Sequence, residues 1–166
     1  MRVLVTYATK TGCTKGVAEK IGEVLGQSGA EVTVAAIEDK PDPSAFDAVI
    51  SGSGVRAGNW HGRAKKWVAA HAETLKSKPT ALYTVCLTMA SDPEKADEVR
   101  AYTDPLLEKT GLQPLDIGLF AGWFEPKEFG VLGRTILRKM GAKEGDFRDW
   151  EAIEAWAKEM GPKLQA

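Results

Sequence analysis

The chain has 166 residues, a length that fits one domain with a hydrophobic core. Its 22 Lys and Arg against 23 Asp and Glu give a formal net charge of -1, which excludes the basic surface typical of nucleic-acid-binding proteins. No apolar run reaches the ~20 residues of a membrane span and the N-terminus lacks the long apolar stretch of a signal peptide, so we expect a cytoplasmic protein.

Strand and helix patterns alternate along the chain. In chain order the patterns predict a strand at 3–7, a helix over 17–25, strands at 32–37 and 48–51, a helix at about 62–76, a strand at 80–87, a helix from 92 to about 110, a strand at 113–121 and a last helix that begins at Asp149. Such alternation indicates one α/β domain over 1–166, with a parallel sheet covered by helices on both faces.

The segment 122–148 does not fit this alternation. It contains Trp123, Phe124 and Phe129, and a short helical pattern from Val131 to Met140. Loops of this length are usually functional or disordered, and the aromatic residues argue against disorder. We therefore expect a functional insertion between the last strand and the last helix.

The stretch YATKTGCTKG, residues 7–16, joins the first strand to the first helix. Ligands bind at the carboxyl ends of parallel strands, and a helix N-terminus there suits phosphate. Neither the P-loop pattern nor the dinucleotide pattern G-x-G-x-x-G is present. Thr9, Thr11, Gly12 and Thr14 form T-x-T-G-x-T instead, which predicts a phosphate site without a metal. The alternative is a simple helix cap made by Thr11 or Thr14.

The T-x-T-G-x-T pattern after the first strand resembles the mononucleotide loop of flavodoxins, which bind FMN. This resemblance implies a flavodoxin-like three-layer sandwich, with a five-stranded parallel sheet in the order 2-1-3-4-5 and an insertion after the fifth strand. Three stretches are similar, more narrowly, to the menaquinone-dependent protoporphyrinogen oxidase branch of that family: SGSGVRAGNWHGRAKKWVAAHAETL, PTALYTVCLTMASDPEKA and AGWFEPKEFGVLGRTILRKMGAKEGDFRDW.

That branch implies an FMN-dependent oxidoreductase of heme biosynthesis, with a porphyrinogen as substrate and a quinone or another redox partner. The alternative is an electron carrier of the flavodoxin type, which has no substrate pocket and is recognised by partner proteins. The near-neutral charge argues against the carrier, because carriers resembling flavodoxin usually dock through an acidic face.

The resemblance places FMN against three loops. The residues expected to contact it are Thr9, Lys10, Thr11, Gly12, Cys13 and Thr14 in the first loop, Ser53, Gly54, Val55, Arg56, Ala57, Gly58, Asn59 and Trp60 in the second, and Thr88, Met89 and Ala90 in the third. Whether Lys10 touches the phosphate is open.

Particular roles follow for three residues of the second loop. Trp60 is expected to stack on the flavin ring or, alternatively, to pack on its neighbouring helix. Gly58 would let a peptide approach the ring closely. Arg56 would stabilise negative charge on the reduced ring, or else pair with a surface carboxylate.

The third loop has neither the tyrosine nor the acidic residues that carriers often place there, and Asp92 is expected to cap the next helix. One flavin face would then be open to a substrate. Trp123, Phe124 and Phe129 would help to form that substrate side. No catalytic residue is predicted.

The positions of the cysteines and histidines predict neither a disulfide nor a metal site. Cys13 lies at the start of the first helix, and Cys86 lies in the fourth strand, where it is expected to be a core residue. In the implied order the third strand lies between them, so their strands would be ~10 Å apart, which is too far for a disulfide. His61 and His71 are distant in sequence and give no metal site. His61 is expected to be a polar residue at a helix start or a participant in proton transfer, and His71 a residue at the edge of the core.

Arg134, Arg138 and Lys139 lie among the apolar residues of the segment 131–140. A basic amphipathic helix can rest on an anionic membrane surface, which would suit a quinone partner. The alternative is an ordinary surface helix, whose charged face is in solvent and whose apolar face packs on the rest of the protein.

Overall fold

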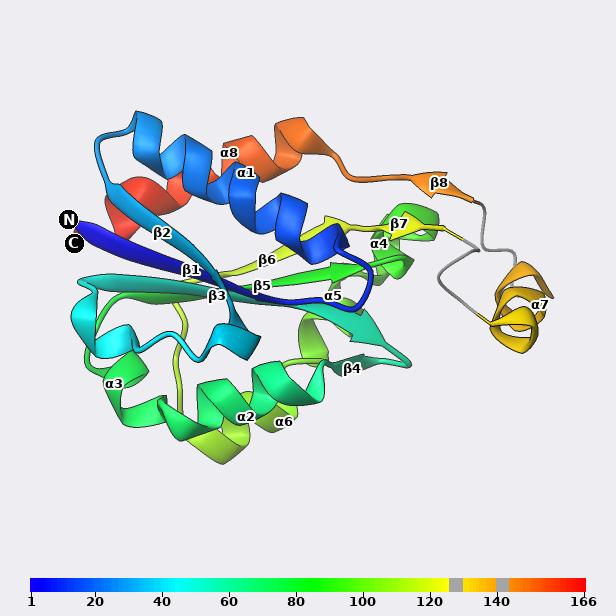
Figure 1. The fold of residues 1–166 in the computed structure, drawn as a ribbon, viewed down its shortest axis with the longest axis horizontal. Coiled ribbons are helices and arrows are strands. Elements are labelled where there is room, and N and C mark those ends of the chain that lie inside the picture. The colour runs from blue at the N-terminus through cyan, green and yellow to red at the C-terminus, as the bar shows by residue number, and fades with distance from the viewer. Residues whose placement is uncertain (126–129, 140–143) are drawn as a thin grey trace.

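A computed structural model describes residues 1–125, 130–139 and 144–166. Figure 1 shows one central sheet with helices on both faces. Phe129 and Met140, which belong to the predicted insertion, lie outside the described residues.

The main sheet contains five parallel strands in the order β2-β1-β3-β5-β6. They are β1 (Arg2–Ala8), β2 (Glu31–Ala36), β3 (Ala48–Arg56), β5 (Thr80–Cys86) and β6 (Ile117–Ala121). When only these five parallel strands are numbered, β5 and β6 are the fourth and fifth strands. The order is then 2-1-3-4-5, which confirms the prediction. A short strand that was not predicted, β4 (Asn59–Trp60), pairs antiparallel with the end of β3.

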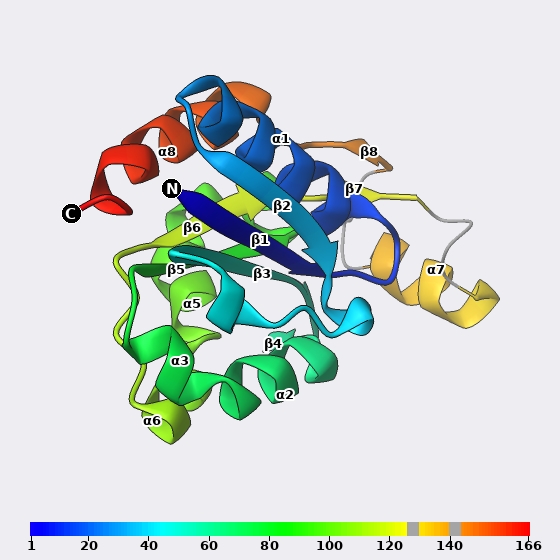
Figure 2. The same ribbon diagram turned by 60° about the vertical axis from the view of Figure 1, so that its left-hand side comes forward.

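Helices form a layer on each face of the sheet, as Figure 2 shows from a second direction. One face carries α1 (Cys13–Gln27) and α8 (Trp150–Lys163), and the other carries α2 (Gly62–Ala70), α3 (Ala72–Lys76) and α6 (Asp104–Thr110). The shorter elements are η1 (Ile37–Asp39), η2 (Pro43–Ala45), α4 (Thr88–Ser91), η3 (Pro93–Lys95) and α5 (Ala96–Ala101).

Alternating strand residues supply the two cores. Val5 and Ile50 face α1 and α8, whereas Leu4, Val49 and Leu82 face α2, α3 and α6, and all five are fully buried. Successive side chains of a strand point to opposite faces, so a strand buried on both sides reads as a continuous apolar run. This packing fixes the strand ends, and with them the loops that follow.

Two predicted helices are divided in the structure. The segment 62–76 breaks at His71, which packs against the Trp67 ring with a centroid separation of 5.0 Å. The segment 92–110 forms η3, α5 and α6 instead of one helix. Pro105 near the start of α6 has no backbone N–H to continue the preceding helix.

Two boundary expectations also need correction. The fifth strand begins at Ile117 rather than at residue 113, since Pro114 cannot donate to a strand ladder. Asp149 caps α8 as predicted, accepting from the Ala152 N–H at 2.9 Å. Asp92 precedes η3, but its side chain does not cap that helix. Its Oδ2 instead lies 3.8 Å from Lys95 Nζ.

The predicted insertion extends from the carboxyl end of β6. β7 (Trp123–Phe124) pairs antiparallel with β8 (Gly145–Asp146), and α7 (Val131–Lys139) lies beyond this ribbon, away from the sheet (Figure 1). Within the described ranges, no helix has the length and apolar character needed to cross a bilayer.

Candidate functional site

A cavity of about 380 Å³ lies at the carboxyl ends of β1, β3 and β5. This volume falls in the range of small-molecule and cofactor sites, roughly 300–1,000 Å³. Its lining residues are Thr9, Lys10, Thr11, Cys13, Thr14, Gly54, Val55, Arg56, Asn59, Trp60, His61, Gly62, Val85, Cys86, Leu87, Gly122 and Trp123.

The first loop presents an open helix N-terminus to this cavity. Gly12 is the N-cap residue of α1, with φ at +86°, a left-handed conformation that glycine adopts without strain. Among the described residues no side chain caps this end, so the alternative of a cap made by Thr11 or Thr14 is not what the structure shows. Thr9 Oγ1 accepts from the Gly12 N–H at 3.0 Å and closes the turn before the helix.

The threonine side chains lie on the cavity wall beside this helix end. Thr14 is 1% exposed, and a Cβ on Gly54 would lie 3.1 Å from Thr14 Oγ1. Gly54 therefore keeps the floor of the cavity clear next to the hydroxyl. An anion at this position would meet Thr11 and Thr14 and the amides of the first turn of α1.

The second loop is a hairpin rather than an open loop. Ala57 and Gly58 both have positive φ, +49° and +70°, and join β3 to β4 in a two-residue turn. This turn directs Trp60 inward: its ring is 2% exposed and its N–H donates to Thr84 Oγ1 at 2.9 Å. The structure favours the packing alternative for Trp60, although the residue still lines the cavity.

Several predicted contact residues do not line the cavity. They are Gly12, Ser53, Ala57, Gly58, Thr88, Met89 and Ala90. Thr88, Met89 and Ala90 form α4, and Gly58 approaches Tyr102 instead. Ser53 connects the hairpin, since its hydroxyl donates to the Gly54 carbonyl and accepts from the His61 N–H.

Seven lining residues were not among those expected to hold FMN. They are His61, Gly62, Val85, Cys86, Leu87, Gly122 and Trp123. Five of them, Val85, Cys86, Leu87, Gly122 and Trp123, lie at or just after the ends of β5 and β6, so their signal in the sequence was the predicted end of each parallel strand. Cys86 was interpreted only as a core residue; it is buried and also reaches the cavity.

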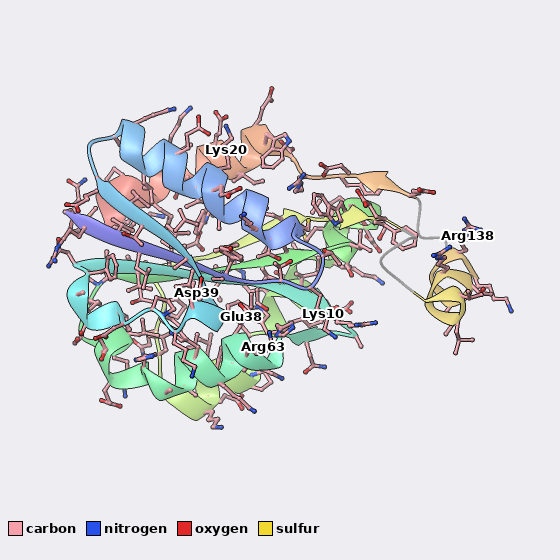
Figure 3. All side chains as sticks on the ribbon, in the orientation of Figure 1. Lys10, Lys20, Glu38, Asp39, Arg63 and Arg138 are labelled. Atoms are coloured by element: carbon pink, nitrogen blue, oxygen red, sulfur yellow. The ribbon has the colours of Figure 1, made fainter. Side chains whose placement is uncertain are left out.

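The cavity wall is basic. The described residues that line it include the cations Lys10 and Arg56 and neither Asp nor Glu. Figure 3 shows Lys10 at the same end of the sheet as Glu38 and Arg63. Glu38 and Arg63 form an ion pair, with 3.0 Å between Oε1 and Nη1. Positive charge beside an open helix N-terminus favours an anionic ligand.

Arg148 connects the insertion to the first loop. Its guanidinium lies 4.4 Å from the centroid of Trp123 and 4.5 Å from that of Trp150, and its Nη2 donates to Asp146 Oδ2 at 2.6 Å. Its Nη1 also donates to the Cys13 carbonyl at 3.5 Å. Hydrogen bonding from Arg148 lowers the pKa of Asp146. No pattern in the sequence indicated this cluster.

Three of the four cysteines and histidines, Cys13, Cys86 and His61, line the cavity. Cys13 and Cys86 are buried thiols with no disulfide between them, as predicted. His61 begins α2 and accepts from the Arg63 N–H through Nδ1, while His71 is half-buried between α2 and α3. The described part of the chain contains no group of His, Cys, Asp or Glu residues arranged to hold a metal ion.

Comparison with known proteins agrees with this geometry. The chain is 25% identical to protoporphyrinogen IX dehydrogenase [quinone] of Escherichia coli strain K12, covering 96% of this chain and 94% of that protein. It is 25% identical to the protein of the same name from Leishmania major, covering 94% of this chain and 73% of that one.

Solved structures share the fold. Oxidised flavodoxin 1 from Bacillus cereus superposes with a TM-score of 0.64 at 16% identity, over 99% of both chains. A flavodoxin from the domain Archaea gives 0.62 at 14% identity, over the whole of both chains. The profile of the flavodoxin domain family matches residues 4–150, and the chain therefore belongs to this family.

Proposed function

We propose that the protein is an FMN-dependent oxidoreductase that takes electrons from a porphyrinogen and passes them to a quinone. The observation that carries the cofactor assignment is the open N-terminus of α1, beside Thr11 and Thr14, in a cavity whose described lining is basic and contains no Asp or Glu. This arrangement suits a terminal phosphate without a metal ion.

The residues present fit FMN on further grounds. The cavity volume of about 380 Å³ is within the range for cofactor sites, and its walls combine apolar residues such as Val55 and Val85 with a few polar groups. Gly54 leaves room beside Thr14, where a side chain would enter the proposed phosphate pocket.

When bound, FMN supplies the redox chemistry of a flavin. The chain supplies binding and electrostatics: Thr11, Thr14 and the α1 amides hold the phosphate, and Arg56 on the cavity wall stabilises negative charge that develops on the ring. Removal of Arg56 distinguishes this role from the alternative, a surface ion pair. The reduction potential of the flavin should change in the first case and stay the same in the second.

The substrate assignment rests on the names of the relatives from Escherichia coli and Leishmania major. In the proposed turnover, the porphyrinogen loses a pair of electrons and two protons. The quinone gains the same electrons and protons and becomes a quinol. The substrate would approach from the side of the insertion, where Trp123 lines the cavity. Phe124, which was also expected there, is 1% exposed and does not line the cavity.

A flavodoxin-type electron carrier is the second candidate, favoured by the solved structures that share the fold. A reductive titration of the FMN-loaded protein with dithionite separates the two. The enzyme is expected to take up both electrons in one step, because Arg56 favours the anionic reduced ring. Reduction in two resolved one-electron steps would support the carrier.

We also propose that the protein is cytoplasmic and contacts an anionic membrane surface through α7. Val131, Leu132 and Ile136 are 79%, 76% and 50% exposed, and Arg138 and Lys139 end the same helix. Apolar side chains beside basic ones suit the boundary between lipid headgroups and acyl chains, where a quinone would be available.

A further inference from the structure

Trp123 carries a buried donor without an acceptor. Its indole Nε1–H is a fully buried polar group that has no hydrogen-bond partner within the described chain. A buried donor left unpaired destabilises the fold, and buried indole N–H groups usually find a partner. The donor therefore points to an acceptor on a ligand.

The position of the ring indicates which part of a ligand it would meet. Trp123 lines the cavity, and a Cβ built on Gly12 would lie 3.7 Å from its Cζ2 atom and 3.8 Å from Cη2. Cζ2 and Nε1 are bonded to the same ring carbon, so the N–H lies close to the ring atoms that approach Gly12. The donor is thus at the end of the cavity where the open N-terminus of α1 lies.

Contacts from the rest of the chain hold the ring in this position. The backbone N–H of Trp123 donates to Cys13 Sγ at 3.2 Å, and the Arg148 guanidinium packs over the ring at 4.4 Å. Arg148 is in turn bound to Asp146. Gly16 leaves space for this arginine, since a Cβ there would overlap Arg148 Nη1. A donor fixed in advance loses little conformational entropy when a ligand binds.

We propose that the Trp123 indole N–H donates a hydrogen bond to an oxygen of the phosphoribityl chain of FMN. Trp123 would then be a cofactor-binding residue supplied by the insertion, in addition to the three loops of the sheet. The proposal rests on FMN as the cofactor, and it explains why the ring is anchored to Cys13 and Arg148.

Replacement of Trp123 by phenylalanine tests the hydrogen bond while keeping an aromatic ring under Arg148. In Trp123→Phe we expect the Kd for FMN, measured by quenching of flavin fluorescence, to rise about tenfold, in line with a lost hydrogen bond to a charged or polar oxygen. Riboflavin, which lacks the phosphate, identifies the acceptor. An unchanged riboflavin Kd assigns a phosphate oxygen, and a raised one assigns a ribityl hydroxyl.

Trp150→Phe is the matched control. Trp150 also contacts Arg148, at 4.5 Å, but does not line the cavity, so its FMN affinity should equal that of the wild type. Equal weakening in both variants, or a wild-type Kd in Trp123→Phe, would overturn the inference while FMN binding itself stands. Failure of the wild type to bind FMN would instead overturn the proposed function.

A second measurement does not depend on the folding of the variant. In the wild-type protein labelled with ¹⁵N at its tryptophans, the Trp123 indole proton should exchange more slowly with water after addition of FMN, as expected for a newly formed hydrogen bond. An unchanged exchange rate at saturating FMN would contradict the proposal.

Discussion

At the scale of single residues, the account depends on hydroxyl and amide groups that surround the end of α1. Thr9 is already used within the chain, because its Oγ1 accepts from the Gly12 N–H. Thr11 and Thr14 lie on the cavity wall, where they can donate to a ligand. Their removal is therefore the direct test of the phosphate assignment.

Thr11→Ala and Thr14→Ala should each raise the Kd for FMN by about tenfold, since each loses one hydrogen bond to a charged phosphate. Riboflavin affinity should be unchanged in both variants. The exposed Thr33 on β2 offers a control, and Thr33→Ala should bind FMN like the wild type. Wild-type FMN affinity in both loop variants would remove the basis of the phosphate site.

Replacement of Trp60 separates its contribution to core packing from any contact with the cofactor. Its ring is 2% exposed and its N–H is bonded to Thr84, so Trp60→Leu should lower the free energy of unfolding by about 2–4 kcal/mol. The FMN affinity of the folded fraction should stay near that of the wild type. Urea unfolding and a fluorescence titration measure the two effects. Strongly weakened FMN binding with unchanged stability would instead support stacking on the flavin.

At the scale of elements, the insertion combines a ribbon anchored to the domain with a helix that lies away from it. Arg148, which follows β8, donates hydrogen bonds both to Asp146 of β8 and to the Cys13 carbonyl at the start of α1. Beyond this anchor, α7 exposes three apolar side chains. The anchor and the helix can be tested separately.

The ion pair of Asp146 with Arg148 predicts a pH dependence. Hydrogen bonding from Arg148 lowers the pKa of Asp146 below its ordinary value of 3.8, so the pair stabilises the fold above that pH. This contribution is lost as the pH falls through the lowered pKa. Asp146→Asn should be less stable than the wild type in urea near neutral pH, and the difference should narrow in acid. Asp39→Asn, on an exposed carboxylate of η1, serves as the control.

The membrane contact of α7 can be measured by co-sedimentation with vesicles. The wild type should bind vesicles that contain phosphatidylglycerol, and added salt should weaken the binding. Leu132→Ser combined with Ile136→Ser should reduce it by about tenfold or more, because both apolar side chains leave the interface. Leu115→Ser alters a 45% exposed leucine elsewhere and should have no effect. Equal sedimentation of all three proteins would argue against the contact.

At the scale of the whole molecule, the parallel sheet followed from the sequence because apolar runs such as 3–5 and 48–50 are buried on both faces. The order of its strands came from the resemblance to flavodoxins. The phosphate loop was also identifiable, since its residues are contiguous. The Ala57–Gly58 turn was not, because alanine at positive φ gives no turn signal. The sequence therefore left open whether Trp60 stacks on the flavin or packs on a helix. Arg148 meets Cys13 across 135 residues of chain, a contact that no local pattern encodes.

The central claim is that a porphyrinogen reduces flavin held in this cavity. The direct measurement is the flavin absorbance of the FMN-loaded protein after anaerobic addition of protoporphyrinogen IX, followed by a menaquinone analogue. The account predicts that the porphyrinogen bleaches the flavin and that the quinone restores the flavin colour. Porphyrin fluorescence should grow only as repeated two-electron turnovers complete the oxidation of the porphyrinogen. Flavin that remains oxidised with the porphyrinogen, yet is bleached by dithionite, would contradict the claim.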